Sequence, residues 1–111
     1  MTTLKHKIDI DNQVNRADLE KLTGSAVIEF GASWCGYCQA AQPIIIAALI
    51  QHQNVKHIKI EDGKGQRLGR SYAVKLWPTL VFLNNGVEVI RLVRPTDSTV
   101  ITDTLNEVYF S

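Results

Sequence analysis

The chain has 111 residues, of which 45% are hydrophobic, a size that can build the core of one domain but not of two. Its 12 lysine and arginine residues face 11 acidic residues, so the formal net charge of +1 predicts no binding to nucleic acid or to an anionic membrane. The first residues lack the apolar core of a secretory signal and no stretch is long enough to span a membrane, so we expect one cytoplasmic domain over residues 1–111.

The first predicted elements are a short strand and a short helix. Residues 5–10 alternate charged and apolar side chains, which is typical of a half-exposed strand at a sheet edge. Asn15 can cap a helix that has Asp18 at its third position, and Gly24 can end that helix.

Residues 26–30 are predicted to form a buried central strand. Apolar side chains occupy both of its faces, as in a parallel strand covered by helices on each side, and Glu29 is its one polar residue. From residue 35 to about residue 53 the pattern is helical, with Pro43 well inside it. A proline there removes a backbone hydrogen bond and clashes with the preceding turn, so we expect a kink. The many apolar residues after Pro43 predict a helix that is largely buried.

The second half of the chain predicts three further strands and a short helix. Residues 55–60 form the first of these strands, and the polar, glycine-bearing residues 61–74 form a short, imperfect helix. Residues 80–83 are an apolar strand, the Asn84-Asn85-Gly86 sequence is a strong hairpin turn, and residues 87–93 return as an antiparallel strand.

A final helix completes the predicted order of elements. Pro95 ends the last strand, Thr96 or Ser98 can cap the helix, and its core-facing residues recur at helical spacing: Ile101, Leu105 and Val108. The order β-α-β-α-β-α-β-β-α predicts an α/β fold. We expect a mostly parallel sheet with helices on both faces and an antiparallel hairpin at one edge.

Both cysteines lie in the sequence Ser33-Trp34-Cys35-Gly36-Tyr37-Cys38, where a predicted strand meets a predicted helix. A helix N-terminus is electropositive, because its first N–H groups are unpaired and its dipole ends there, and this favours a thiolate. Cysteines at i and i+3 lie on one helix face, about 5–6 Å apart at Cβ. A relaxed disulfide is shorter than this, so a bridge here should be reducible. We expect redox chemistry rather than a structural staple, with Cys35 favoured as thiolate over Cys38.

A zinc site is the alternative, because Cys35 and Cys38 are followed by His52 and His57 at a two-Cys, two-His spacing. One helix from Cys35 to His52 would separate these residues by roughly 25 Å. Zinc needs its four ligands within about 2.0–2.3 Å. We therefore expect no bound metal within the chain, and both histidines should face solvent at a helix end and a strand start.

The chain resembles the thioredoxin family. The resemblance is carried by Trp34-Cys35-Gly36-Tyr37-Cys38, by Pro43 at the family's kink position, by Pro78-Thr79 before the hairpin, and by the order of elements along the chain. It implies a thioredoxin fold, a three-layer sandwich with a central mixed sheet. Gly36-Tyr37 departs from the dipeptides typical of thioredoxins and glutaredoxins.

The resemblance also implies an activity. Cys35 would attack a protein disulfide, Cys38 would resolve the mixed disulfide, and Pro78 would lie beside them in the cis form. The protein would need no bound cofactor other than its redox-active disulfide Cys35–Cys38, would act as a monomer, and would receive electrons from a thiol donor such as a thioredoxin reductase. We expect a protein-disulfide reductase. The alternative is a thioredoxin-like binding or regulatory module for one partner, with incidental redox activity.

Glu29 stands where thioredoxins carry a buried aspartate that exchanges the proton of the resolving thiol. A carboxyl group among apolar neighbours should have a raised pKa, as a group that exchanges protons near neutrality requires. The alternatives are that its longer side chain turns to solvent or forms a structural ion pair with Lys59. We favour proton transfer.

The resemblance also places a substrate groove around the cysteines. Trp34 and Tyr37 are expected to contact partners, and Trp77 replaces a small aliphatic residue whose backbone binds substrate. Arg94-Pro95 stands where thioredoxins usually have a small glycine-containing loop. The full set of expected substrate-binding residues is Trp34, Gly36, Tyr37, Trp77, Pro78, Thr79 and Arg94. For the arginines at positions 67, 70, 91 and 94 we favour a solvated charged face, and the alternative is a patch that selects partners. If that patch lies beside Cys35, it should lower the pKa of this thiol and favour acidic partners.

Overall fold

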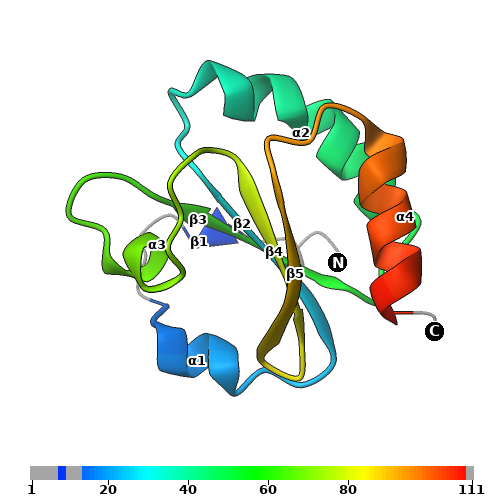
Figure 1. The fold of residues 1–111 in the computed structure, drawn as a ribbon, viewed down its shortest axis with the longest axis horizontal. Coiled ribbons are helices and arrows are strands. Elements are labelled where there is room, and N and C mark those ends of the chain that lie inside the picture. Colours follow the sequence, from blue (N-terminus) through cyan, green and yellow to red (C-terminus); the bar gives the residue numbers. More distant parts are fainter. Residues whose placement is uncertain (1–7, 10–13, 110–111) are drawn as a thin grey trace.

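The computed structural model describes residues 8–9 and 14–109, which form a sheet with helices on both faces (Figure 1). The elements follow the predicted order along the chain. They are β1 (Ile8–Asp9), α1 (Arg16–Glu20), β2 (Ser25–Gly31), α2 (Gly36–Leu49), β3 (Lys56–Glu61), α3 (Arg67–Ser71), β4 (Thr79–Asn84), β5 (Val87–Val93) and α4 (Ser98–Tyr109).

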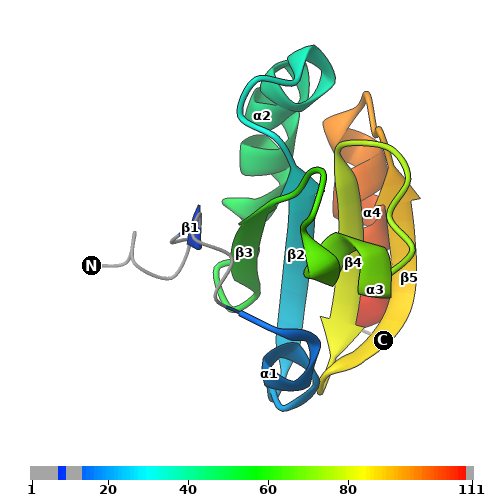
Figure 2. The same ribbon diagram turned by 90° about the vertical axis from the view of Figure 1, so that its left-hand side faces the viewer.

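The sheet is mixed and has five strands in the order β1-β3-β2-β4-β5. β1, β3 and β2 are parallel, whereas β4 runs antiparallel to β2 and pairs with β5 as a hairpin at the sheet edge. The described part of the predicted first strand, β1, lies at the opposite edge, and the rest of that prediction falls outside the described residues. Because β2 has a strand on each side and helices above and below, its five inner residues are buried (Figure 2).

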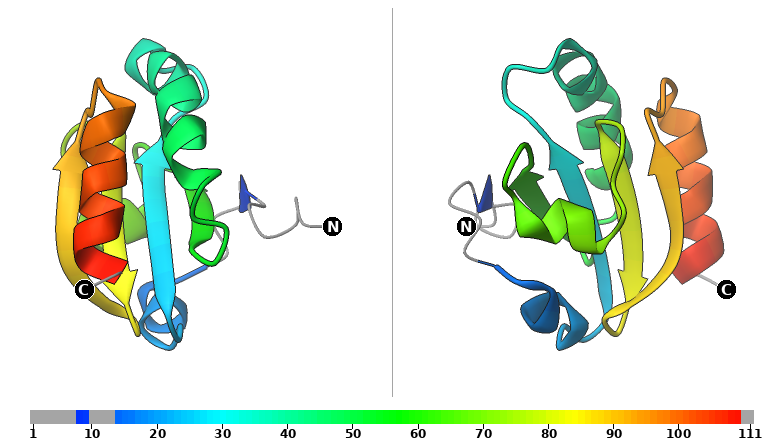
Figure 3. Two further views of the ribbon diagram at one scale, coloured as in Figure 1. Left: turned by 90° about the vertical axis from the view of Figure 1, so that its right-hand side faces the viewer. Right: turned by 60° about the vertical axis from the view of Figure 1, so that its left-hand side comes forward.

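Two hydrophobic cores fill the space between the sheet and its helices. α2 and α4 lie side by side on one face (Figure 3), over a core whose largest members include Ile45, Phe82 and Leu105. α1 and α3 cover the other face, over a core that includes Phe30 and Tyr72. Side chains alternate between the two faces along β2, so Glu29 faces α2 while its neighbours Ile28 and Phe30 face the opposite core.

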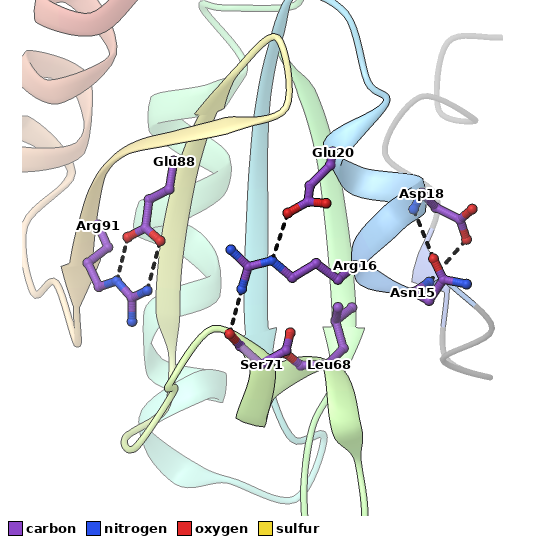
Figure 4. A network of polar contacts seen from close by, with 8 residues as sticks. All are labelled: Asn15, Arg16, Asp18, Glu20, Leu68, Ser71, Glu88 and Arg91. Atoms are coloured by element: carbon purple, nitrogen blue, oxygen red, sulfur yellow. Dashed lines mark hydrogen bonds and ion pairs between the residues drawn. The ribbon is translucent and has the colours of Figure 1, made fainter.

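α1 begins with the predicted cap. The Asp18 N–H donates to the Asn15 side chain at 2.9 Å, and the Asn15 N–H donates to the Asp18 carboxylate at 3.1 Å (Figure 4). Arg16 then links α1 to α3, since its guanidinium donates to the Ser71 carbonyl and lies 3.9 Å from the centre of the Tyr72 ring. These contacts hold the two short helices together on one face of the sheet.

The predicted hairpin turn between β4 and β5 is confirmed. Asn85 and Gly86 both have positive φ angles, 51° and 81°, as a two-residue type I′ turn requires. The Asn85 N–H donates to the Gly24 carbonyl at 2.9 Å, and the Gly24 N–H donates to the Asn85 side chain at 2.7 Å. A Cβ atom at Gly86 would collide with the backbone of Glu20, so the turn is packed tightly against the end of α1.

α2 departs from the prediction that it is largely buried. Ile45 and Leu49 pack into the core, but Ile46 and Ile50 are exposed. The prediction is wrong because α2 covers only one face of the sheet, so the opposite side of the helix meets solvent. The helix continues through Pro43, as predicted, and the kink at that residue remains a prediction.

The cap of α4 also differs from the prediction. Asp97 accepts a hydrogen bond from the Thr99 N–H at 2.8 Å, so its carboxylate, rather than Thr96 or Ser98, satisfies the first turn. A carboxylate is also favoured here by the helix dipole. Of the predicted core stripe, Ile101 and Leu105 are completely buried and Val108 is half-buried.

Candidate functional site

The two cysteines lie at the N-terminus of α2, after the loop that leaves β2 (cyan in Figure 1). Cys35 is the N-cap residue, and its sulfur accepts a hydrogen bond from the Cys38 N–H at 3.4 Å. Cys38 lies one turn into the helix, against Gly31 of β2, where an added Cβ would come within 2.8 Å of the Cys38 sulfur. Both side chains are buried free thiols, so the structure is that of the reduced pair.

The environments of the two thiols shift their pKa values in opposite directions. Burial acts to raise the pKa of Cys35, but hydrogen bonds from Cys38 and the Tyr37 N–H, with the charge of Arg94, hold it below the ordinary value of 9.0. Burial raises the pKa of Cys38 to about 12, and Cys35 and the negative charge of Glu29 add to this rise. The predicted preference for a thiolate at Cys35 is therefore confirmed.

Glu29 projects from β2 toward α2 and is only 2% exposed. One of its carboxylate oxygens lies 2.7 Å from His57 Nε2, and the other accepts a hydrogen bond from the Gln42 side chain, also at 2.7 Å. Gln42 in turn accepts a hydrogen bond from the Lys59 ammonium at 2.8 Å and donates to the Cys38 carbonyl at 3.1 Å. Lys59 thus supports Glu29 through Gln42 and through its charge, whereas His57 is in direct hydrogen-bonded contact with the Glu29 carboxylate.

The predicted rise in the pKa of Glu29 is wrong. Burial does raise this pKa, but the hydrogen bond and charge of His57, the hydrogen bond from Gln42 and the charge of Lys59 outweigh it. The net pKa lies below the ordinary value of 4.5. The prediction considered the apolar neighbours of Glu29 along β2, whereas the polar groups that decide the pKa come from β3 and α2.

The prediction that both histidines face solvent is also wrong. His57 is 6% exposed and His52 is 4% exposed. In the parallel register of β2 and β3, His57 lies beside Val27 and Lys59 beside Glu29, so His57, Lys59 and Glu29 share the face covered by α2. His52 lies beyond the C-terminal end of α2, at the opposite end of that helix from the cysteines.

A pocket of about 270 Å³ connects Cys38 with Glu29. Its lining combines both of these residues with polar groups from α2, β3 and the loop after β2, among them Ser33, Gln42, Lys59 and Glu61. A pocket of this size has room for several water molecules, which the polar groups of its lining could bind. The resolving cysteine and the buried carboxylate therefore line the same pocket.

Aromatic side chains surround the cysteines as predicted. Trp34 is 72% exposed and packs edge-on against Trp77, with ring centres 5.4 Å apart. The Trp77 indole N–H donates to Asp62 at 3.0 Å, and the Trp77–Pro78 peptide bond is cis. The pair therefore links the loop before Cys35 to the segment before β4. Tyr37, also exposed, lies on the first turn of α2.

Arg94 lies close enough to Cys35 for its charge to lower the pKa of that thiol. Its Nε donates to the Trp77 carbonyl at 2.8 Å, its backbone N–H donates to the Pro78 carbonyl at 2.8 Å, and its guanidinium lies 3.9 Å from the centre of the Tyr37 ring. Its φ angle of 52° is in the left-handed region that favours glycine. A pocket of about 380 Å³ beside it is lined by Tyr37, Ala40, Ala41, Ile44, Pro78, Arg94, Pro95 and Thr96.

The remaining predicted residues lie in two settings. Gly36 is exposed at the start of α2, whereas Thr79 is buried and its hydroxyl donates to the Leu76 carbonyl at 2.6 Å. Arg91 pairs with Glu88 on β5 at 2.7 Å, and Arg67 and Arg70 lie on α3. Of the four arginines considered, it is Arg94 whose charge acts on Cys35.

Two groups of the site were missed by the sequence analysis. Gln42 lies one helical turn after Cys38, on the face of α2 that meets the sheet, and its spacing could have indicated this. His57 could have been found from the alternation of β3, in which His57 and Lys59 share a face opposite to Ile58 and Ile60.

In the described part of the chain, three or more His, Cys, Asp or Glu side chains do not gather in a group that could hold a metal. None of the described helices is long and apolar enough to cross a membrane.

Comparisons with known proteins identify relatives of this chain. The family model described as Thioredoxin matches residues 6–107. A thioredoxin from Chlamydia pneumoniae is 31% identical over 87 residues, which are 77% of this chain and 83% of that protein. Thioredoxin 2 from Pseudomonas aeruginosa PAO1, solved in its reduced form, is 48% identical over 85% of this chain and 87% of that one, with a TM-score of 0.77. A thioredoxin structure from Fasciola hepatica is 30% identical over 84% of this chain and 93% of that one, with a TM-score of 0.71.

The fold, the spacing of the two cysteines and these relatives agree with one another. The sheet with helices on its two faces superposes on solved thioredoxins over most of its length. Thioredoxins exchange thiols and disulfides through their own cysteines, with no further cofactor. The chain therefore belongs to the thioredoxin family and is a thiol–disulfide oxidoreductase.

Proposed function

We propose that this protein reduces disulfide bonds in other proteins, with Cys35 as the attacking thiolate and Cys38 as the resolving thiol. The observation that supports this division of roles is the opposite shift of the two pKa values, downward for Cys35 and to about 12 for Cys38. At neutral pH the thiolate, which is the nucleophile, is therefore concentrated on Cys35. Cys38 stays protonated until the second step needs it.

The reaction has two exchange steps. The Cys35 thiolate attacks one sulfur of the substrate disulfide, a mixed disulfide forms, and the other substrate sulfur leaves as a thiolate. Cys38 then loses its proton and attacks the Cys35 sulfur, so the Cys35–Cys38 bond forms and the second substrate sulfur leaves. The substrate gains two electrons and the protein is oxidised to its disulfide. An external thiol donor, such as a thioredoxin reductase, returns the pair to the dithiol.

Glu29 is the group that we assign to take the Cys38 proton. Cys38 and Glu29 line the same pocket, and water in that pocket can carry a proton between them. Deprotonation of Cys38 is the demanding part of the second step, because its pKa of about 12 lies far above neutral pH. A base in the same buried space lowers this barrier.

The substrate would bind over the exposed surface around Cys35. Trp34 and Tyr37 offer large apolar contacts, and exposed aromatic residues of this kind are enriched where proteins meet. The Arg94 guanidinium adds a positive charge beside Tyr37, which favours substrates with acidic residues near their disulfide. Gly36 and Trp77 complete the proposed contact surface, and the buried Pro78 and Thr79 support it from the interior.

Turnover of a protein disulfide tests the proposal. The wild-type protein should reduce insulin catalytically with dithiothreitol as the electron donor. Cys35→Ser should abolish turnover, because the nucleophile is lost, and Cys38→Ser mixed with insulin without dithiothreitol should stop after one mixed disulfide per protein molecule. If the wild-type protein does not turn over, the proposal is wrong and a binding or regulatory role becomes the better explanation.

A further inference from the structure

The contact between Glu29 and His57 joins two titratable side chains inside the protein. Glu29 is 2% exposed and His57 is 6% exposed, and Glu29 Oε1 lies 2.7 Å from His57 Nε2. A distance this short is typical of a strong hydrogen bond in which one partner is charged. Because both groups are buried, water competes little for the proton between them.

Glu29 without His57 is poorly suited to keep a proton at neutral pH. Its surroundings favour the carboxylate, since His57, Gln42 and Lys59 together lower its pKa. A carboxylate that is stabilised in this way binds a proton only briefly near neutral pH. An imidazole, in contrast, generally changes its protonation state within about pH 5–8. The pair therefore contains a group suited to hold the proton that Glu29 receives.

We propose that Glu29 and His57 form a proton-accepting pair, in which Glu29 receives the proton of Cys38 and His57 holds it across their 2.7 Å contact. This inference rests on the proposed function, since it concerns the step in which Cys38 resolves the mixed disulfide. His57 acts through Glu29 and is a positioning residue, because it does not itself touch the reacting sulfurs.

The step balances in protons and electrons. The Cys38 S–H bond breaks, its proton passes through water in the shared pocket to the Glu29 carboxylate, and Glu29 then gives this proton to His57 Nε2. The Cys38 thiolate attacks the Cys35 sulfur, and the electron pair of the mixed disulfide leaves on the substrate sulfur. The step requires the tautomer of neutral His57 that carries its proton on Nδ1, and it ends with a cationic imidazolium beside the Glu29 carboxylate.

The other charged groups around the pair act on this transfer in different ways. Lys59 on β3 stabilises the Glu29 carboxylate through Gln42 and disfavours a second positive charge nearby. Cys38 on α2 is the proton source, and Glu61 lines the same pocket. In the antiparallel register with β4, the residue opposite Glu29 is the apolar Leu80, so that strand adds no charge at this position. The Glu29 carboxylate, 2.7 Å from His57 Nε2, would offset the positive charge of an imidazolium.

Ellman's reagent isolates the step in question. Attack by Cys35 releases one thionitrobenzoate, and attack by Cys38 on the resulting mixed disulfide releases a second one. The second release is unimolecular, so its rate at stoichiometric reagent reports the resolution step alone. In the wild-type protein this rate should fall as the pH drops, with a midpoint that matches the titration of the His57 ring observed by NMR.

His57→Gln provides the direct comparison, because glutamine can still donate a hydrogen bond to Glu29 but cannot hold the proton. The first release should be unchanged, whereas the second should slow by about 10- to 100-fold and lose its dependence on pH near neutrality. His52→Gln is the matched control, since it replaces another buried histidine, 4% exposed, at the far end of α2. It should leave both releases and the pH profile as in the wild type.

Each outcome decides between explanations. Circular dichroism shows whether the His57→Gln protein is folded. If it is folded and releases the second thionitrobenzoate with the wild-type rate and pH profile, the inference is falsified, while the reductase proposal stands. If His57→Gln does not fold, the wild-type protein provides the test. The inference is contradicted if the rate of the second thionitrobenzoate release stays constant over the pH range in which NMR shows that His57 titrates. If the wild-type protein releases only one thionitrobenzoate, the proposed function itself fails.

Discussion

At the scale of single residues, Cys35 and Cys38 show how one helix turn separates two chemical roles. Cys35 is the N-cap of α2 and receives the hydrogen bond of the Cys38 N–H, whereas Cys38 lies against β2 in the same space as Glu29. The first position stabilises negative charge and the second opposes it. These positions predict which thiol is alkylated first, how the charge of Arg94 affects the alkylation of Cys35, and how Glu29 makes the stability of the fold depend on acid pH.

Alkylation of the reduced protein by iodoacetamide should show the division directly. The rate at Cys35 should rise with pH around a midpoint below 9.0, because its thiolate is stabilised. Cys38 should remain unmodified until the pH approaches about 12. Peptide mapping by mass spectrometry assigns each adduct, and modification of Cys38 before Cys35 at neutral pH would contradict the assignment of roles.

Arg94→Gln should slow alkylation of Cys35 at neutral pH. The charge of Arg94 is among the causes that lower the pKa of Cys35, so its removal raises that pKa and reduces the thiolate fraction. We expect an effect of about two- to fivefold, the range for a partly exposed charge. Arg91→Gln is the control, because Arg91 pairs with Glu88, and it should leave the rate unchanged.

Glu29 should make the stability of the fold depend on acid pH. Its pKa in the folded protein lies below 4.5, so the unfolded chain binds this proton more tightly than the folded protein does. The stabilising contribution is therefore complete above pH 4.5 and is lost as the pH falls through the folded pKa. Urea unfolding of Glu29→Gln should show a weaker loss of stability in this acid range than the wild type.

Glu107→Gln serves as the control for that measurement, since Glu107 is exposed on α4. Its unfolding free energy should follow the wild-type dependence on pH. Equal acid dependence of the Glu29→Gln and wild-type proteins would show that Glu29 is not stabilised as a carboxylate.

At the scale of elements, the junctions between strands and helices place the site. Glu29 and Gly31 of β2 lie on the face of the sheet that α2 covers. α2 begins after the loop that follows β2. On the opposite face, the cap at Asn15 and the contacts of Arg16 hold α1 against α3 (Figure 4). That second layer contains none of the reacting groups, so changes there should affect stability alone.

Asn15→Ala tests this separation of stability from activity. Loss of the capping hydrogen bonds should lower the free energy of unfolding by about 0.5–2 kcal/mol, without changing the rate of disulfide reduction. Asn54→Ala, at an exposed turn residue before β3, should change stability by less than about 0.5 kcal/mol. Equal losses in the two variants, measured by urea unfolding, would show that the cap does not stabilise α1.

The sequence predicted elements more successfully than it predicted contacts between them. The strand at residues 87–93, the hairpin turn and the cap at Asn15 follow from local patterns, and the structure confirms them. The burial of His57 and its contact with Glu29 depend on the register of β2 and β3, which brings together residues 28 positions apart. The register between β2 and β3 cannot be derived from a local sequence pattern. The direction of the pKa shift of Glu29 was therefore predicted wrongly, because His57 and Lys59 of β3 lower this pKa.

At the scale of the whole molecule, the fold presents a small reactive surface on a rigid support. Two cores on opposite faces of the sheet fix β2, and α2 and α4 pack together above it. The exposed Trp34 and Tyr37 and the half-buried Arg94 surround Cys35 at one end of this support. A partner that binds this surface would lie over Cys35 at the start of α2, while Glu29 and His57 remain in the interior.

The reduction potential of the Cys35–Cys38 pair tests most directly whether the protein works as a reductase. The pKa of Cys35 is lowered while that of Cys38 is raised to about 12, so thiolate stabilisation, the effect that makes a pair strongly oxidising, is confined to one of the two thiols. Equilibration with glutathione buffers should give a potential of about −220 mV or lower, at or below the cytosolic glutathione poise. A value of about −180 mV or higher would contradict the reductase assignment and indicate an oxidase or isomerase.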